Sequence, residues 1–148
     1  MTAAEIEQAL AGLRMGMSSI PFNQHIGFEL SVIDGGFALS FPMKPELVGS
    51  TAQQSLHSGV IATAMDMIGG STGIIAAYQK IPPEERPQRL PRFGTIDMSV
   101  NYLQPGRGQR FTATGQLVRI GKKTCVTQMA LYNDADELIA TATGSYMF

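Results

Sequence analysis

The spacing of apolar and polar residues predicts a helix at the start of the chain and a hairpin after it. Thr2-Ala3-Ala4-Glu5 has the pattern of a capping box and Gly16 is typical of a helix end, so we expect a helix over about residues 3–15. The next segment, 20–26, is ambiguous and fits a single turn after Pro21. Two alternating runs then flank the turn sequence Asp34-Gly35-Gly36 and predict an antiparallel hairpin, residues 28–33 and 37–41.

One long apolar run dominates the middle of the chain. After a polar loop at 42–55, residues 58–79 have the apolar content expected of a buried helix, and a loop rich in proline and arginine follows at 81–91. From Gly94 onward the period changes to two, because polar residues at 95, 97, 99 and 101 alternate with apolar residues at 96, 98, 100 and 102. This alternation is typical of a half-buried strand. Three further strands are expected at residues 110–119, 124–132 and 137–147.

These elements predict an α+β fold in a single domain spanning residues 1–148. Strands that follow one another through short turns form antiparallel sheets, and the central helix must bury one face against such a sheet. The composition, 44 % apolar and 16 % charged over 148 residues, fits one globular domain with a sizeable core.

Charge and cysteine content argue against several classes of protein. The net charge of −1 without a long basic block argues against a nucleic-acid binder, and a single cysteine rules out an intrachain disulfide framework. The chain begins with Glu5 and Glu7 where a secretory signal would be positive, so we expect a cytoplasmic protein. Residues 59–77 are long enough to cross a membrane, but they hold Asp66, four glycines and several hydroxyl residues, and we expect no span.

Asp66 is the only formally charged side chain between Leu56 and Gln79. An acid in such an apolar run is costly to bury unless it has partners, so it is a candidate functional group; the alternative is a structural carboxylate held by hydrogen bonds. At helical spacing one side of this segment is apolar and should pack on the sheet: Leu56, Val60, Ile61, Ala64, Met65 and Ile68. Asp66 falls on a different stripe of mostly small residues: Gly59, Ala62, Thr63, Gly70, Gly73 and Ala77.

Glycine in the middle of a helix costs about 1 kcal/mol relative to alanine, so something is expected to approach this stripe closely. Either the backbone of a partner subunit or a ligand fits that description. Ser58 and Gly59 lie in the first turn, where free backbone N–H groups suit a developing negative oxygen. Gly59 lies seven residues before Asp66, which places both on one face about 10 Å apart. A water activated by the carboxylate would then attack a carbonyl polarised at the helix start.

The two histidines give little support for other chemistry. His57 does not share the Asp66 face by ideal helical geometry, which favours a capping or packing role over that of a general base. No metal site is expected, because His25 and His57 are the only histidines and no ligand spacing is present. Cys125 alternates with Thr127, Met129 and Leu131, which indicates a core thiol and not a nucleophile.

Two motifs resemble those of a known family. His57-Ser58-Gly59, Asp66 and Gly69-Gly70 resemble the HGG…D…G signature of hotdog-fold acyl-CoA thioesterases, specifically the PaaI-like (phenylacetic-acid-degradation) branch. The sequence Gly94-Thr95-Ile96-Asp97-Met98, followed by Asn101-Tyr102-Leu103-Gln104-Pro105, resembles the G-[ST]-x-D-[ML]…Y-x-x-P strand of that branch. The resemblance covers roughly residues 22–146 and includes the order of the elements.

The resemblance implies a hotdog fold, an antiparallel sheet wrapped around one long helix, in a homodimer or homotetramer with sites at the dimer interface. It implies hydrolysis of an acyl-CoA or acyl-carrier-protein thioester by Asp66, which activates water or attacks directly. Thr95, preceded by Gly94, is expected to position the water and to be brought near Asp66 by dimer formation, and the backbone N–H of Ser58, beside Gly59, would polarise the carbonyl. No cofactor is expected, because coenzyme A is part of the substrate.

The chain departs from the family pattern at two positions. Ser58 replaces the first glycine of HGG, which keeps the backbone donor but narrows its conformational freedom. Thr51 stands where many members carry a carbonyl-binding asparagine, and Gln53 or Gln54 is a possible substitute. Phosphates of coenzyme A need cations, for which the two candidate groups are Arg86, Arg89 and Arg92 before the Thr95 strand, and Lys122 and Lys123 after Gly121. Ordinary surface charge remains the alternative for each of them.

Two other functions stay open at this point. A hotdog dehydratase or hydratase would use His57 with an acid, although the usual sequence around a dehydratase histidine is absent. A non-catalytic acyl-CoA-binding domain fits the departures at Ser58 and Thr51.

Overall fold

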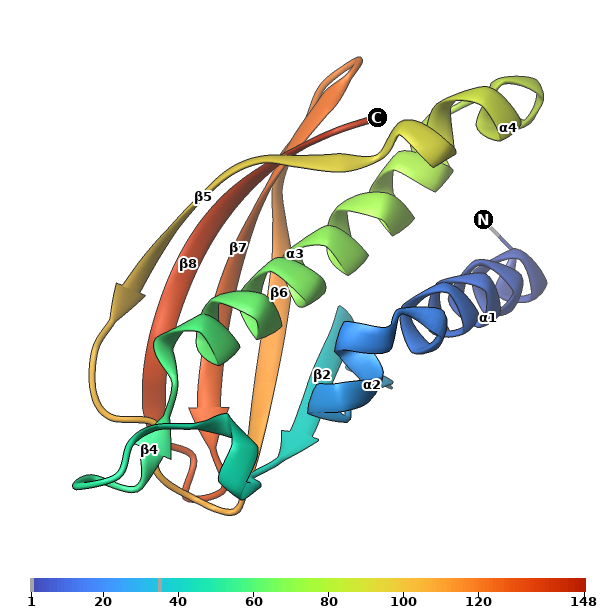
Figure 1. Ribbon diagram of the computed structural model, residues 1–148. Coiled ribbons are helices and arrows are strands. Elements are labelled where there is room, and N and C mark those ends of the chain that lie inside the picture. Colours follow the sequence, from blue (N-terminus) through green and yellow to red (C-terminus); the bar gives the residue numbers. More distant parts are fainter. Residues whose placement is uncertain (1, 35) are drawn as a thin grey trace.

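A six-stranded antiparallel sheet curves around one long helix, α3 (Ser58–Lys80), in a computed structural model that describes residues 2–34 and 36–148 (Figure 1). The strands lie in the order β1-β2-β6-β7-β8-β5, so β1 and β5 form the two edges. Their bounds are β1 (Glu29–Ile33), β2 (Gly36–Pro42), β5 (Gly94–Tyr102), β6 (Arg110–Ile120), β7 (Thr124–Asn133) and β8 (Leu138–Met147). The expected α+β class, with one central helix against an antiparallel sheet, is confirmed.

The apolar side of α3 packs into the hollow of the sheet, as its spacing predicts. Ile61, Ala64, Met65 and Ile68 are all at most 4 % exposed. The sheet supplies large side chains to the same core, among them Phe41 and Phe111, whose rings stack 5.4 Å apart. By length and composition α3 would suffice to cross a membrane, but 56 % of its most apolar window is buried inside the fold. Burial against the sheet accounts for its apolar character.

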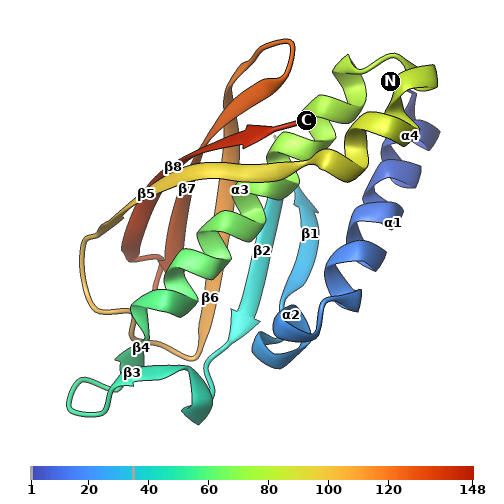
Figure 2. The ribbon, with the colours of Figure 1, turned by 45° about the horizontal axis from the view of Figure 1, so that its top comes forward.

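The first helix is longer than the sequence predicts. α1 (Ala3–Ser19) begins with the expected capping box of Thr2 and Glu5, but it continues through Gly16. It ends where Ile20 turns extended, because a residue followed by proline is driven out of the helical region. Pro21 then opens the short α2 (Pro21–Ile26). Figures 1 and 2 show α1 beside α3 with its N-terminus near the C-terminal end of α3, so the two helices run in opposite directions.

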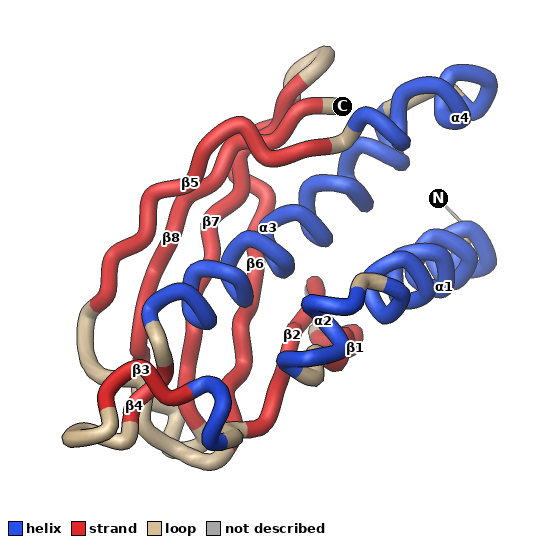
Figure 3. Tube along the Cα trace, in the orientation of Figure 1, coloured by secondary structure: helices blue, strands red, loops and turns tan. Residues whose placement is uncertain are grey.

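Both expected loops contain regular structure (Figure 3). The 42–55 segment holds a 3-10 turn (Pro45–Leu47) and a small hairpin of β3 (Val48–Ser50) and β4 (Ser55–Leu56). The 81–91 segment is a chain of short turns, η2 (Pro83–Glu85), α4 (Arg86–Arg89) and η3 (Leu90–Arg92). Each of these turns has a proline at its first or second position, where the fixed φ of proline favours helix and its missing N–H costs nothing. β1 and β2 pair as the expected hairpin, although the centre of its turn, Gly35, lies outside the described residues.

Two positions on α3, Gly69 and Gly73, leave no room for a side chain, because other side chains of the same chain pack against them. A Cβ at Gly69 would collide with the Tyr146 hydroxyl and would lie 2.8 Å from Met129 Sδ. A Cβ at Gly73 would lie 2.9 Å from Cys125 Sγ and 3.1 Å from Phe93 Cζ. Close approach was expected for the stripe that contains Gly73, but the expected source, a partner backbone or a ligand, is wrong at that position, because Cys125 and Phe93 of the same chain occupy it.

Candidate active site

Asp66 and Thr95 meet within one chain. Asp66 is half-buried in the middle of α3, and Thr95 is the second residue of β5. The Thr95 hydroxyl donates a hydrogen bond of 2.9 Å to Asp66 Oδ1. Thr95 was expected to come near Asp66 through dimer formation, and this expectation is wrong, because strand β5 itself passes α3 at this point. The register of β5 shifts between Thr95 and Asp97, and Ile96 is left 53 % exposed where plain alternation would bury it.

Tyr146 is a second donor to the same carboxylate, and sequence reasoning missed it. It lies on β8 directly opposite Thr95, and its hydroxyl is 3.3 Å from Asp66 Oδ1 and 3.4 Å from the Asp66 backbone oxygen. Its ring is 1 % exposed and stacks on Phe93 with centroids 5.6 Å apart. Burial, and next the charge of Asp66, raise the pKa of Tyr146 well above its usual range, so the hydroxyl stays protonated and remains a donor. The sequence could have indicated Tyr146 only through its pairing with Thr95, and that pairing is known only once the register of β5 and β8 is known.

The two oxygens of the Asp66 carboxylate therefore differ. Thr95 and Tyr146 both donate to Oδ1, whereas Oδ2 has no hydrogen bond among the described residues. Two donors on one oxygen fix the orientation of the group. The other oxygen keeps its lone pairs for a water proton or an electrophile.

Asp66 borders a cavity of about 680 Å³. That size lies within the range of about 300–1,000 Å³ that is usual for small-molecule sites. The walls are mainly apolar and come from α1, from the C-terminal half of α3 and from Leu90 and Phe93, with Gly94, Thr95 and Tyr146 beside the carboxylate. Gly94 and Thr95, both singled out from the sequence, thus lie at this cavity.

The start of α3 does not reach this cavity in the same chain. Ser58 lines a separate pocket with Tyr102 and Leu103, and the Tyr102 hydroxyl donates a 3.2 Å bond to the Ser58 carbonyl. The expectation that Ser58, Gly59 and Asp66 line one site on a single helix is therefore not met within one chain. A separation of seven residues places Gly59 and Asp66 on the same face of α3. Strand β5 runs along that face, with Thr95 beside Asp66 and Tyr102 beside Ser58.

His57 caps α3, the role that its spacing favours. Its Nδ1 accepts the Gly59 N–H at 2.8 Å, so the Gly59 amide is occupied. The Val60 amide donates to the His57 carbonyl at 3.0 Å. Among the hydrogen bonds of the described residues, the Ser58 amide has no acceptor, which leaves it as the donor available at this helix start.

The candidates for a carbonyl-binding side chain lie in a third pocket. Thr51, Gln53 and Gln54 line it with Arg107, away from the Asp66 cavity of the same chain. The backbone carbonyls of Thr51 and Gln53 accept bonds from Gln54 Nε2 (2.8 Å) and Arg107 Nε (3.0 Å). These bonds tie the loop to its own neighbours.

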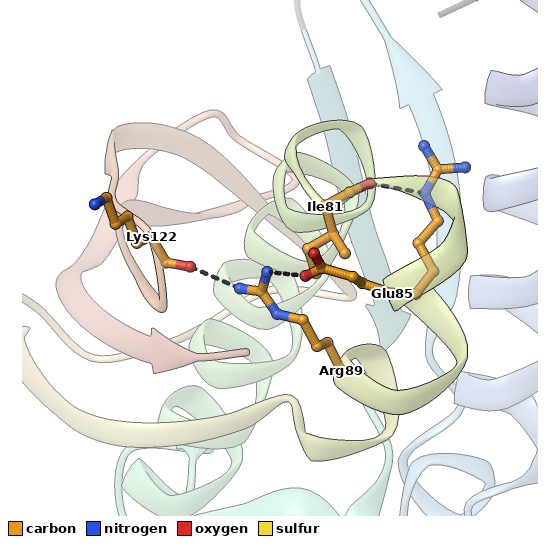
Figure 4. Close-up of polar contacts among 5 residues, drawn as sticks. Ile81, Glu85, Arg89 and Lys122 are labelled. Atoms are coloured by element: carbon orange, nitrogen blue, oxygen red, sulfur yellow. Dashed lines mark hydrogen bonds and ion pairs between the residues drawn. The ribbon is translucent and has the colours of Figure 1, made fainter.

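One hydrogen bond, from Arg89 to the backbone of Lys122, joins the two candidate cation groups (Figure 4). Arg89 donates to Glu85 Oε2 at 3.0 Å and to the Lys122 carbonyl at 2.6 Å, which holds the arginine segment against the β6–β7 turn. Arg86 is held by the Ile81 carbonyl at 3.1 Å, and its guanidinium lies 4.0 Å from the centre of the Tyr78 ring. Arg92, Lys122 and Lys123 are exposed, and their side chains take part in no ion pair among the described residues.

Cys125 is a core thiol, as its alternation predicts. It is 1 % exposed and packs beside Gly73 and Tyr146. Burial raises the pKa of its thiol, which keeps it protonated and unsuited to nucleophilic attack.

Comparisons with known proteins show the family of this chain. A family model described as the thioesterase superfamily matches residues 53–140, which include α3, β5, β6, β7 and the start of β8. The chain belongs to the thioesterase superfamily. It is 44 % identical to the medium/long-chain acyl-CoA thioesterase YigI of Escherichia coli K12, in a match that covers 95 % of this chain and 94 % of the relative.

Solved structures share the fold. A Shewanella oneidensis protein described as related to the thioesterase superfamily is 39 % identical, with a TM-score of 0.88 and 99 % of each chain covered. The BH2602 protein of Bacillus halodurans, solved with CoA, is 21 % identical, with a TM-score of 0.68 and coverage of 99 % and 92 %. The hotdog thioesterase architecture expected from the motifs is confirmed, whereas membership of the PaaI-like branch stays a prediction.

Proposed function

We propose that this member of the thioesterase superfamily hydrolyses acyl-CoA thioesters through Asp66. The observation that carries the proposal is the pair of donors on Asp66 Oδ1, which leaves Oδ2 free beside an apolar cavity. Apolar walls suit a fatty acyl group and not a polar one. The relative YigI, which is named for medium- and long-chain acyl-CoA, supports the same substrate class.

The reaction follows from this arrangement. Asp66 Oδ2 takes a proton from water as the water oxygen attacks the thioester carbonyl carbon, and the carbonyl oxygen becomes negative. A helix-start amide stabilises that oxygen. When the carbon–sulfur bond breaks, the carboxyl returns its proton to the thiolate, which gives free acid and CoA thiol. Direct attack by Oδ2 is the variant in which an anhydride forms first and water then cleaves it.

The phosphates of CoA are expected to bind at the protein surface. Of the candidate cations, Arg92, Lys122 and Lys123 are available to them, because Arg89 already bonds Glu85 and the Lys122 carbonyl.

The expected cytoplasmic location belongs to the same proposal. A dehydratase is not carried further, because the Nδ1 atom of His57 is engaged in capping α3.

A homodimer, itself able to pair into a tetramer, completes the site in this proposal. β5 is an edge strand, and it leaves Ile96 and Tyr102 53 % and 51 % exposed, an apolar edge that suits pairing. Thr95 at one end of β5 bonds Asp66, and Tyr102 at the other end bonds Ser58. Antiparallel pairing of two β5 strands therefore brings Ser58 of the partner subunit opposite this chain's Asp66.

Complementation between two inactive variants tests the shared site. Ser58→Pro removes the amide donor at a helix position that tolerates proline, and it is expected to lower kcat about a hundredfold. Asp66→Asn removes the carboxylate from the other side. Mixed and reannealed, the two variants are expected to recover activity, because each mixed dimer holds one intact site. A mixture as inactive as its components, with dimers seen by sedimentation velocity, would contradict a shared site.

Hydrolysis by the wild type tests the activity itself. We expect release of CoA thiol from dodecanoyl-CoA and hexadecanoyl-CoA, measured with a thiol reagent, and slower release from acetyl-CoA, because acetyl fills little of the cavity. Tight binding without thiol release would support the acyl-CoA-binding domain instead. Formation of an enoyl product from a hydroxyacyl-CoA would support the dehydratase.

A further inference from the structure

The first helix, α1, forms one side of the cavity beside Asp66. Both helices line the cavity, α1 with Leu13, Gly16 and Met17 among others, and α3 with residues that include Met67 and Ile74. The helices run in opposite directions, so the beginning of α1 lies beside the C-terminal end of α3 (Figure 2), and its end lies farther towards the middle of α3. Tyr78 belongs to the last turn of α3, and Asp66 lies three turns before it. The cavity therefore extends away from the carboxylate along α1, over about 18 Å from Asp66 to Tyr78 at helical rise.

Two glycines open the α1 wall. Gly12 and Gly16 both line the cavity, and a Cβ built at either position meets no heavy atom within 4 Å. They differ in this from Gly69 and Gly73, whose hydrogens are required by packing. Glycine in a helix interior costs about 1 kcal/mol, and here no contact among the described residues explains it. The space that the glycines leave is continuous with the cavity.

The far end of the cavity is fixed. Tyr78 and Gln8 lie there, and the Tyr78 ring is held under the Arg86 guanidinium at 4.0 Å. Arg86 is in turn anchored to the Ile81 carbonyl. An acyl chain that enters beside Asp66 thus runs along apolar side chains, and the cavity ends at the polar groups of Gln8 and Tyr78.

We propose that α1 measures the acyl chain: Gly12 and Gly16 determine how long a chain the enzyme accepts, by leaving the channel between α1 and α3 open. Gly16 lies nearer the reacting carbonyl, and Gly12 lies one helical turn, about 6 Å, farther along. A side chain at Gly16 therefore excludes shorter chains than the same side chain at Gly12. This inference rests on the proposed acyl-CoA hydrolysis for its substrate, but the channel itself is tested without hydrolysis.

The kinetic test uses Gly12→Leu and Gly16→Leu. Each methylene kept out of the cavity is expected to lower kcat/KM about fourfold. In Gly12→Leu, kcat/KM should fall about fiftyfold or more for hexadecanoyl-CoA and little for octanoyl-CoA. In Gly16→Leu, kcat/KM should fall for both substrates. Ala11→Leu is the matched control, since Ala11 is an exposed neighbour on α1 that does not line the cavity. Its chain-length profile should equal that of the wild type.

Binding separates this inference from the proposed activity. Titration calorimetry with S-dodecyl-CoA, which cannot be hydrolysed, should show affinity weakened at least about tenfold by Gly16→Leu and unchanged by Ala11→Leu. Free CoA should bind all variants equally. If Gly16→Leu binds S-dodecyl-CoA as tightly as the wild type, the acyl chain does not lie along α1 and the inference fails, whether or not the wild type hydrolyses thioesters. Hydrolysis that is absent while the binding pattern holds would instead remove the proposed function alone.

Discussion

Asp66→Asn is expected to lower kcat for dodecanoyl-CoA by at least about a hundredfold, the scale of losing a general base. The amide has nearly the same shape as the carboxylate, but it cannot take a proton from water or act as a nucleophile. Its oxygen can still accept the Thr95 and Tyr146 hydroxyls, which lie 2.9 and 3.3 Å from Oδ1 in the native protein. KM is therefore expected to change little, and steady-state thiol release measures both constants.

Thr95 provides the matched series for this experiment. Thr95→Val keeps the β-branched shape but removes the donor, and a lost hydrogen bond to a charged group corresponds to about tenfold or more in kcat. Thr95→Ser keeps the hydroxyl and should remain close to the wild type. Equal turnover in Asp66→Asn and the wild type would exclude Asp66 as the reacting group. Equal losses in the valine and serine variants would indicate that the shape of Thr95 matters and its hydroxyl does not.

Gly69→Ala is expected to lower the free energy of unfolding by up to about 2 kcal/mol. Its Cβ would overlap the Tyr146 hydroxyl and crowd Met129 Sδ at 2.8 Å, and overpacking a core costs about 1–3 kcal/mol. The gain in helix propensity, about 1 kcal/mol, offsets only part of that cost. Tyr146 cannot move away freely, because its ring is buried and stacked on Phe93. Urea denaturation measures the change.

The neighbouring glycine is the control for this prediction. A Cβ at Gly70 would lie 3.5 Å from Tyr146 Cε1 and 3.7 Å from Phe93 Cε1, which are ordinary contacts. Gly70→Ala should therefore stabilise the protein by up to about 1 kcal/mol through helix propensity. Both variants are compared at one protein concentration, because dimer formation would add to stability. The same sign for both substitutions would contradict the packing described for Gly69.

The sequence was sufficient for the fold because its strongest patterns are local. The strand positions expected from alternation agree with β6, β7 and β8 within one residue, and the apolar run agrees with α3. The proline-rich loops were misjudged because proline ends a helix that precedes it but also favours a new helical turn when it lies at that turn's first or second position. Gly16 did not end α1, because a single glycine weakens a helix without stopping it. The helix ends before Pro21, because the proline ring clashes with a helical conformation at the preceding residue, Ile20.

The candidate site was only partly visible in the sequence. Asp66 stood out as a charge in an apolar run, and Thr95 came from a motif, but their contact depends on where β5 crosses α3. Tyr146 could not be predicted, because its contact with Asp66 depends on strand register and burial, which the pattern of apolar and polar residues does not specify. The cavity wall formed by α1 was missed for a related reason: helix direction and separation are set by packing, and not by the period of α1 alone.

The most direct test of the central claim is a crystal structure with an acyl-CoA analogue in which a methylene group separates the sulfur from the carbonyl. We predict that the carbonyl lies beside Asp66, with a water or the carboxylate oxygen in position to attack it, and that the alkyl chain lies between α1 and α3. A carbonyl bound away from Asp66 and Thr95, in either subunit, would contradict the account.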